Sequence, residues 1–427
     1  MANCQKLVVN GGRRLEGELR VHGAKNSALP LLAACVLAHG ECVLHNCPEL
    51  TDVDAACRIL SCLGCRCTRS GDTVCVDASN VCGNEIPDNL MREMRSSIVF
   101  LGAVLGRTRR CKLTFPGGCE LGARPIDLHL AALRDMGVTI SEEHGWLECT
   151  AAGGIRGGIV TLSFPSVGAT ENIMLAAVTA SGRTEIHNAA REPEIIDLAE
   201  FLVKCGAKIT GAGGSTICVE GVSRLSPAEH TVIPDRIVAG TYLCAAAMTR
   251  GELILTRCEP SHMTGFLPVL ESMGCRICPY GGGKLYVNCP RRLNAPPTIR
   301  TMPYPGFPTD IQALFTAVCS AAEGTAVFVE TIFENRYRHI PELIRLGASI
   351  KVEGRVAVVQ GVEQLSGAKL CAGELRGGAA LVTAALAAEG TSEITGVGYI
   401  DRGYESIEKA LRSVGADISR VGQQSRN

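Results

Sequence analysis

The sequence has 427 residues, of which 46% are hydrophobic and 20% are charged, and its formal net charge at pH 7 is −1. This length exceeds one ordinary hydrophobic core and predicts two or three domains, since domains usually contain roughly 100–200 residues. The near-zero charge and the single Trp exclude a general attraction to nucleic acid and base recognition by stacked aromatic side chains. An anionic ligand must therefore bind to a local cluster of Arg and Lys.

Residues 1–12 lack the apolar run of a signal peptide, and the later apolar stretches have the length of core helices. The protein is therefore expected in the cytoplasm. Its 22 cysteines are too few for a disulfide scaffold, so free and mostly buried thiols are expected. Groups such as Cys62, Cys65 and Cys67 lack the further Cys or His that would complete a zinc site, so no metal is expected.

An internal repeat organises the chain. A glycine flanked by apolar or cysteine residues recurs about every 70 residues. Each glycine ends an amphipathic helix and leads into a strand, which is a common role of glycine at helix C-termini. The positions are Gly64, Gly137, Gly206, Gly274, Gly347 and Gly415. Six repeating units are therefore predicted.

In chain order, the short strands 6–9 and 18–21 precede the first unit, which begins near Lys25. Each unit is predicted to run helix, strand, loop, helix, strand, strand. The sixth unit has only one closing strand, 417–421. The N-terminal strands are therefore predicted to complete this last unit.

This closure defines two lobes of three units each. One lobe comprises residues 1–24 and 235–427, and the other comprises residues 25–234, including a loop that carries Cys119. The chain crosses between the lobes twice, and this connection is expected to act as a double hinge. The predicted fold class is α/β, with two domains and six pseudo-symmetric units.

Polar residues begin the first helix of every unit. Pseudo-symmetry directs these helix starts toward one place, and helix N-termini attract anions through their free N–H groups and the helix dipole. A hydroxyl or carboxylate at such a position also commonly caps its own helix without binding a ligand. The helix starts, each opening with a polar residue, are Lys25-Asn26, Arg95-Ser96-Ser97, Ser166-Val167-Gly168, Asp235-Arg236, Thr309-Asp310 and Glu374-Leu375-Arg376.

Arginines begin several of the second helices. A guanidinium group presents five donors in a planar fork, which suits carboxylates and phosphates. A single arginine at a loop end more often binds backbone carbonyls or a surface carboxylate, but recurrence weakens that interpretation. The residues are Arg124, Arg191, Arg336 and Arg402.

The glycine-rich segment Pro116–Pro125 differs from its counterparts because it carries Cys119 shortly before Arg124. An exposed thiol near cations favours the reactive thiolate, although most cysteines are buried and inert. No Walker P-loop, Gly-x-Gly-x-x-Gly motif or zinc-protease His pair occurs in the sequence. No cofactor is therefore expected.

Several of these segments resemble one known family over essentially the whole chain. They are Gly23–Asn26, Pro116–Pro125, Ser166–Thr170, Asn188–Pro193, Ile233–Arg236, Pro308–Asp310 and Ile400–Glu405. The sequence resembles the UDP-N-acetylglucosamine 1-carboxyvinyltransferases, enolpyruvyl transferases of peptidoglycan synthesis. The resemblance implies two inside-out α/β barrels of three units each. It also implies transfer of the enolpyruvyl group of phosphoenolpyruvate to the sugar 3′-hydroxyl.

The resemblance also implies roles for individual residues. It gives Cys119 as proton donor and covalent nucleophile and Asp310 as the base, with Lys25, Asn26, Arg124 and Arg402 binding phosphoenolpyruvate. Lys25, Arg402 and Glu374 match catalytic positions, and Arg336 and Arg376 match further active-site arginines. The expected UDP-N-acetylglucosamine contacts are Asn26, Arg95, Arg124, Pro125, Ile126, Asp127, Leu128, Ser166, Val167, Gly168, Asp310 and Ile332. No nucleic acid, membrane or obligate protein partner is implied.

Glu374 departs from the family pattern, which has Asp before Leu-Arg, and so adds a methylene at a catalytic position. Three alternatives remain at this point. A 3-phosphoshikimate 1-carboxyvinyltransferase shares the fold, but the Cys119 loop and Ser166–Gly168 argue against it. An RNA 3′-phosphate cyclase is built from similar units, but the neutral charge argues against RNA. An inactive UDP-sugar sensor is suggested only by Glu374.

Overall fold

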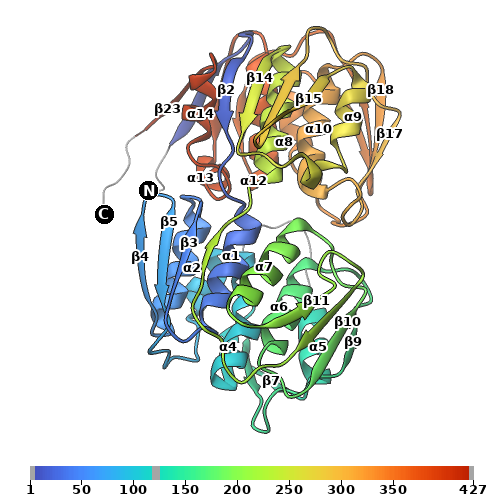
Figure 1. The fold of residues 1–427 in the computed structure, drawn as a ribbon. Coiled ribbons are helices and arrows are strands. Elements are labelled where there is room, and N and C mark those ends of the chain that lie inside the picture. Colours follow the sequence, from blue (N-terminus) through green and yellow to red (C-terminus); the bar gives the residue numbers. More distant parts are fainter. Residues whose placement is uncertain (1–4, 118–125, 423–427) are drawn as a thin grey trace. The chain divides into compact units, whose positions relative to one another are not determined.

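The computed structural model describes residues 5–117 and 126–422, which form two compact domains. Domain 1 comprises residues 5–22 and 234–422, and domain 2 comprises residues 23–117 and 126–233 (Figure 1). The chain passes between them at His22–Gly23 and at Ile233–Pro234.

Domain 1 contains three four-stranded sheets, with strand orders β2-β14-β16-β15, β17-β18-β20-β19 and β21-β22-β1-β23. Its elements are β1 (Lys6–Asn10), β2 (Glu16–Arg20), α8 (Arg236–Thr249), β14 (Glu252–Thr256), η2 (Pro260–Met263), α9 (Leu267–Met273), β15 (Arg276–Gly281), β16 (Lys284–Asn288), β17 (Thr298–Arg300), α10 (Thr309–Ala321), β18 (Thr325–Val329), α11 (Ile340–Arg345), β19 (Ser349–Glu353), β20 (Val356–Gln360), β21 (Lys369–Cys371), α12 (Leu375–Ala387), β22 (Thr391–Thr395), α13 (Val397–Ile400), α14 (Ile407–Ser413) and β23 (Asp417–Val421).

Domain 2 contains two four-stranded sheets and one three-stranded sheet, with orders β13-β3-β5-β4, β9-β10-β12-β11 and β6-β8-β7. Its elements are α1 (Lys25–Cys35), β3 (Glu41–His45), α2 (Thr51–Cys62), β4 (Arg66–Ser70), β5 (Thr73–Asp77), α3 (Asp88–Glu93), η1 (Arg95–Val99), α4 (Phe100–Thr108), β6 (Arg110–Thr114), α5 (Asp127–Asp135), β7 (Thr139–Glu143), β8 (Trp146–Thr150), β9 (Ile159–Thr161), α6 (Val167–Ala177), β10 (Arg183–His187), α7 (Pro193–Lys204), β11 (Lys208–Thr210), β12 (Thr216–Glu220) and β13 (Glu229–Thr231).

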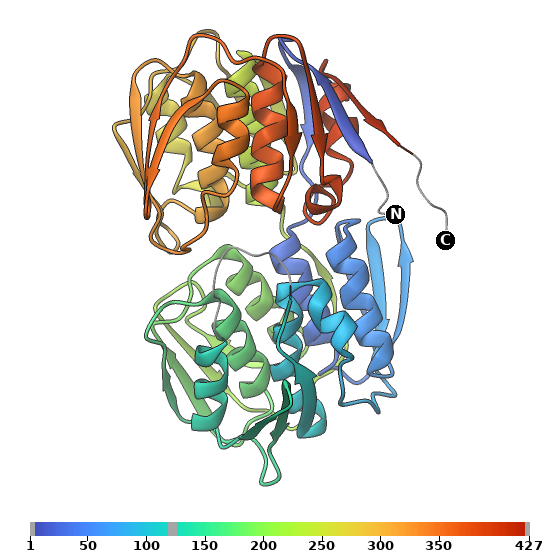
Figure 2. The ribbon, with the colours of Figure 1, turned by 180° about the vertical axis from the view of Figure 1, so that it is seen from behind.

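In each domain, the first helix of every repeating unit lies in the middle and the sheets lie outside (Figures 1 and 2). In domain 1, helices α8, α10 and α12 pack against one another and are buried on nearly every side. Their Ala-rich sequences suit this position because small side chains allow helices to approach closely. The strands alternate between buried and exposed residues, as in β20, because each sheet buries one face. The predicted inside-out α/β architecture is confirmed.

The complete unit is longer than the sequence pattern predicted, because a short strand precedes its first helix. In the third, fifth and sixth units these strands are β9, β17 and β21, each three residues long. Each pairs in parallel with the strand that follows the first helix. Three residues are too few to show an alternation of apolar and polar side chains, so the sequence pattern did not predict these strands.

The two N-terminal strands join different sheets, which corrects the prediction that both complete the last unit. Strand β1 lies between β22 and β23 and fills the gap in the sixth unit. Strand β2 instead pairs in parallel with β14 and takes the first-strand place of the fourth unit. Strand β13 fills the same place in the first unit by pairing with β3. Both strands lie next to a chain crossing, so the chain order of these two units is interrupted.

The repeated glycines adopt the left-handed conformation that ends a helix. Gly64, Gly137, Gly206, Gly274, Gly347 and Gly415 have φ values between 83° and 114°. Side chains with a Cβ rarely adopt this conformation. These glycines therefore fix the length of the second helix of each unit.

The cysteines act mainly as small apolar residues, and the described ones are free thiols. Cys65 and Cys275 are buried at equivalent positions after the helix-ending glycines, as predicted. No group of potential ligands in the described part of the chain has the geometry to hold a metal ion. Nor does any helix there combine the length and apolar character needed to cross a bilayer.

Two adjacent valines in β1 test whether one face of this strand is buried in the core. Val9 is fully buried and Val8 lies on the more exposed face. Val9→Ala should lower the free energy of unfolding by about 2 kcal/mol, because it removes buried methyl groups and leaves a cavity. Val8→Ala should have less than half that effect, measured by urea unfolding. Equal losses for the two variants would contradict the burial of one β1 face.

Candidate active site

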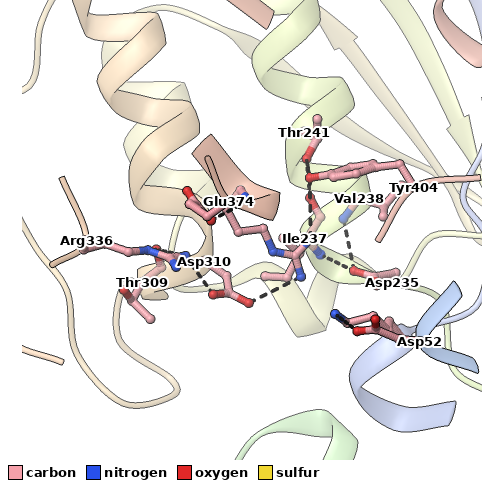
Figure 3. A network of polar contacts seen from close by, with 12 residues as sticks. Asp52, Asp235, Ile237, Val238, Thr241, Thr309, Asp310, Arg336, Glu374 and Tyr404 are labelled. Atoms are coloured by element: carbon pink, nitrogen blue, oxygen red, sulfur yellow. Dashed lines mark hydrogen bonds and ion pairs between the residues drawn. The ribbon is translucent and has the colours of Figure 1, made fainter. Parts of the chain in front are cut away.

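The Asp310 carboxylate of domain 1 lies between two buried arginines (Figure 3). Arg336 Nη2 donates to Oδ1 at 2.8 Å, and Arg376 Nη2 donates to Oδ2 at 3.3 Å. The arginine side chains are 1% and 4% exposed, whereas that of Asp310 is 28% exposed. One side of this carboxylate therefore remains accessible.

Asp310 is not the N-cap of its helix. Pro308 occupies the N-cap position of α10, and Asp310 is the second helical residue. Its carboxylate is engaged by arginine side chains instead of serving as a cap. The capping interpretation of Asp310 is therefore wrong, and the helix start presents the carboxylate to a cationic environment.

Arg336 is held rigidly by backbone and side-chain acceptors. Its Nε and Nη2 donate to Thr309 O at 3.1 and 2.9 Å. Thr309 Oγ1 in turn donates to Glu330 Oε2 at 3.0 Å. The other Glu330 oxygen accepts from Ile332 N at 2.8 Å and Phe333 N at 3.0 Å. Glu330 therefore connects Asp310 to the turn that contains Ile332.

Glu374 caps helix α12 with its side chain. The carboxylate accepts hydrogen bonds from Arg376 N at 2.8 Å and from Gly377 N, and the residue is 2% exposed. The longer Glu side chain still reaches the first-turn N–H groups of the helix. The structure thus gives Glu374 a capping role that orients the start of α12, which carries Arg376.

Arg376 reaches from α12 toward two partners. Besides Asp310, its Nη1 donates to the Tyr404 hydroxyl at 3.5 Å, and this hydroxyl lies 2.8 Å from Thr241 Oγ1. Burial, the largest single effect, disfavours the charge of Arg376, but Asp310, Tyr404 and Asp235 together outweigh it and raise the pKa of Arg376 above its usual value. Burial also raises the pKa of Tyr404. Arg376 therefore remains a cation in an almost water-free environment.

Arg402 of domain 1 lies next to a cluster of charged side chains. Arg402, half-buried, follows Asp401, whose carboxylate receives Arg420 Nη1 and Nη2 at 2.8 and 2.7 Å. Arg420 also binds both oxygens of Glu408, each at 3.0 Å. Two of these charge-assisted bonds hold the side chain of Asp401, the neighbour of Arg402, and the other two hold that of Glu408.

Lys25 of domain 2 forms a buried ion pair. It begins helix α1, and its Nζ lies 2.9 Å from Asp52 Oδ2 on α2. The two side chains are 9% and 4% exposed. Asn26, the next residue, is half-buried. Asp52 was not predicted, since the sequence shows only an acidic residue in the first turn of an ordinary amphipathic helix.

Several predicted nucleotide-sugar contacts lie at helix starts of domain 2. Ser166 caps α6 by accepting from Ala169 N at 3.4 Å, and Val167 and Gly168 begin that helix. Asp127 and Leu128 begin α5, directly after the buried Ile126. Arg95 begins η1, donates to Pro116 O at 3.1 Å and has its pKa lowered by burial.

Four of the predicted site residues contact one another in the structure, and three others lie in a segment that the structure does not describe. Asp310, Arg336, Arg376 and Glu374 form one connected network in domain 1 (Figure 3). Cys119, Arg124 and Pro125 lie outside the described residues. The sequence analysis missed residues such as Asp52 and Glu330. These residues bind predicted ones, Lys25 and Thr309, that are distant from them in the sequence.

Comparisons with known proteins agree on the class of enzyme. A family model described as EPSP synthase (3-phosphoshikimate 1-carboxyvinyltransferase) matches residues 9–411. The crystal structure of the enolpyruvyl transferase NikO from Streptomyces tendae superimposes with a TM-score of 0.89 at 26% identity, covering 99% of this chain and 100% of that one. EPSP synthase from Acinetobacter baumannii shares the fold, with a TM-score of 0.77 at 18% identity over 98% of this chain and 100% of its own. The fold and the family model define an enolpyruvyl transferase.

Full-length relatives identify the branch. UDP-N-acetylglucosamine 1-carboxyvinyltransferase 2 of Caldanaerobacter subterraneus is 55% identical, covering 97% of this chain and 99% of the relative. UDP-N-acetylglucosamine 1-carboxyvinyltransferase 1 of Symbiobacterium thermophilum is 49% identical, with 98% and 95% covered. The chain therefore belongs to the UDP-N-acetylglucosamine 1-carboxyvinyltransferase family.

A buried histidine beside this network predicts a pH dependence of stability. His339 is 4% exposed, and neither ring nitrogen has a hydrogen-bond partner in the described part of the chain. Burial lowers the pKa of His339 from 6.5 to about 4; the charge of Arg336 adds to this effect, whereas Glu374 and the backbone of Arg336 oppose it. In the unfolded chain the imidazole takes up a proton below pH 6.5, so the unfolded state binds more protons than the native state in this window.

Stability should therefore fall as the pH falls, and His339 should account for about 2 kcal/mol of that loss between pH 7 and pH 5. His339→Leu and His339→Gln should both remove this component of the slope, because neither side chain titrates. Urea unfolding at several pH values measures it. An unchanged slope in both variants would show that the native imidazole is already protonated or is solvated.

Proposed function

We propose that this protein transfers the enolpyruvyl group of phosphoenolpyruvate to the 3′-hydroxyl of UDP-N-acetylglucosamine and releases phosphate, the first committed step of peptidoglycan synthesis. The proposal is supported by membership of the family and by relatives that carry this name across their whole length. Both substrates are small molecules, and we place the reaction in the cytoplasm. The observation that carries the mechanism is the accessible Asp310 carboxylate between two buried arginines.

We assign Asp310 as the base that removes the proton of the 3′-hydroxyl. Its ion pairs with Arg336 and Arg376 require the ionised form, which is the form that accepts a proton. The buried guanidinium groups fix the direction of the carboxylate, and its exposed side faces away from them. Orientation of this kind makes a large contribution to rate, since small displacements of a catalytic group are costly.

Addition across the double bond requires a second proton. As the hydroxyl oxygen bonds to the substituted carbon of phosphoenolpyruvate, the terminal methylene carbon must receive a proton, which we assign to the Cys119 thiol. Loss of phosphate and of one proton from the resulting methyl group then restores the double bond. The atoms balance without a cofactor, because the phosphate group leaves with the electron pair of its bond to carbon.

The remaining predicted residues bind the two substrates in this proposal. Lys25, Asn26, Arg124 and Arg402 bind the carboxylate and phosphate of phosphoenolpyruvate, for which cationic and amide donors are suited. Arg95 and the starts of α5 and α6 bind the nucleotide sugar through backbone N–H groups and side chains. We place Glu374 among the positioning residues, because its carboxylate caps α12 and is almost fully buried.

The variant Asp310→Asn tests the role of the base. Asparagine accepts hydrogen bonds but cannot take the hydroxyl proton, so phosphate release should fall by at least about 100-fold. Binding of UDP-N-acetylglucosamine should change little, as measured by calorimetry. Asp135→Asn is a matched control, since this aspartate is exposed at the end of α5. Turnover of Asp310→Asn within about threefold of wild type would remove Asp310 as the base.

Selective labelling tests the role of Cys119. An epoxide phosphonate resembles phosphoenolpyruvate in charge, so the basic residues should concentrate it near this thiol and favour the reactive thiolate. Peptide mapping after brief exposure should show modification at Cys119, with loss of activity in proportion and faster reaction when UDP-N-acetylglucosamine is present. The variant Cys119→Ser is the control. Equal labelling of the exposed thiols Cys62, Cys82, Cys278 and Cys371 would refute the assignment.

A further inference from the structure

A buried histidine and asparagine lie directly behind the predicted nucleotide-sugar residues of α6. His129 belongs to α5 and is 7% exposed, and Asn172 belongs to α6 and is fully buried. Their side chains are joined by a contact of 2.7 Å between Asn172 Nδ2 and His129 Nδ1. Neither residue was singled out by its position in the sequence.

The Asn172 amide has a defined orientation. Its Oδ1 accepts from Gly102 N at 2.7 Å, and its Nδ2 donates to Ile98 O at 2.9 Å. A flipped amide would place an NH₂ group against the Gly102 N–H and a carbonyl oxygen against Ile98 O, so the observed orientation is the only one that satisfies both. The second hydrogen of Nδ2 is therefore directed to His129.

This orientation fixes the tautomer of His129. Because Asn172 Nδ2 is a donor, His129 Nδ1 must be the acceptor, and the single proton of the neutral imidazole lies on Nε2. Burial, with a smaller contribution from Arg95, lowers the pKa of His129 to about 4. The ring is therefore neutral near pH 7 and presents an N–H donor at Nε2.

The Nε2 side of the ring faces the first turn of α6. A Cβ atom at Gly168 would lie 3.1 Å from His129 Cε1 and 3.4 Å from Nε2. The ring thus occupies the space beside Gly168 that a side chain would need. Within the described part of the chain, the only hydrogen bond of His129 is the one at Nδ1, and no acceptor is found there for its Nε2–H.

Further donors lie at the same helix start. Ser166 Oγ accepts from Ala169 N, and Ser166 O accepts from Thr170 N. The N–H groups of Val167 and Gly168 belong to the first turn and have no acceptor within the helix. The imidazole N–H of His129 and these two backbone N–H groups therefore lie at the same helix start, and none of them has an acceptor among the described residues. An oxygen-rich ligand would satisfy all three.

We propose that His129 is a further substrate-binding residue, whose Nε2–H donates a hydrogen bond to an acceptor oxygen of UDP-N-acetylglucosamine at the start of α6. This inference rests on the proposed function. The uridine diphosphate part of this substrate carries both carbonyl and phosphate oxygens, and a neutral donor suits either. Asn172 acts as the positioning residue that keeps the proton on Nε2.

Two substitutions separate substrate binding from structural support. In His129→Asn, the side-chain oxygen lies near the former Nδ1 and still accepts from Asn172, but the donor at Nε2 is lost. In His129→Gln, the amide nitrogen lies near the former Nε2 and keeps a donor there, but the acceptor for Asn172 is lost. Calorimetric titration with UDP-N-acetylglucosamine and with UDP, together with Tm and steady-state kinetics, distinguishes the two effects.

The proposal predicts that His129→Asn weakens UDP-N-acetylglucosamine binding by about tenfold, with a matching rise in its KM. Its kcat, its KM for phosphoenolpyruvate and its Tm should stay close to wild type. His129→Gln should bind the substrate more tightly than His129→Asn but unfold at a lower temperature. Wild-type affinity in a folded His129→Asn protein would overturn the proposal.

A measurement on the wild-type protein covers the case in which a variant does not fold. With isotope-labelled histidine, the NMR signal of the His129 Nε2 proton should shift when UDP-N-acetylglucosamine is added. An unshifted signal at saturation would also overturn the proposal. Failure of wild-type protein to bind UDP-N-acetylglucosamine at all is a separate result, which would refute the proposed function itself.

Discussion

The ion pairs of Asp310 with Arg336 and Arg376 are the interaction on which the domain 1 site depends. Both arginines are almost fully buried, and a buried guanidinium without a partner would be strongly destabilising. The ionised carboxylate at the start of α10 supplies that partner. Neighbouring residues serve the same arrangement, because Glu330 holds the turn beside Arg336 and Glu374 caps the helix that carries Arg376.

The repeating architecture explains why such residues lie at helix starts. Each unit places its first helix in the middle of the domain, buried on nearly every side, so only the helix ends can present polar groups. Domain 2 uses the same positions for Lys25, Arg95 and Ser166. A repeated fold thus offers several equivalent places for binding residues, and each unit fills its place with a different side chain.

Much of this organisation could be predicted from the sequence. The six helix-ending glycines gave the number of units because a left-handed C-terminal residue leaves a clear sequence signal, and the family resemblance gave the fold class and the reaction. What could not be predicted depends on tertiary pairing. Strand β2 joins β14, far away in the chain, and Asp52 and Asn172 act through partners that no local pattern identifies.

The central claim is that the enolpyruvyl acceptor is a nucleotide sugar, and an acceptor competition tests it most directly. The wild-type protein is incubated with phosphoenolpyruvate and equal amounts of UDP-N-acetylglucosamine and shikimate 3-phosphate, and the products are identified by mass spectrometry. We predict that only UDP-N-acetylglucosamine gains the enolpyruvyl group, with one phosphate released for each product molecule. Formation of enolpyruvylshikimate 3-phosphate, or phosphate release without either acceptor, would contradict the account.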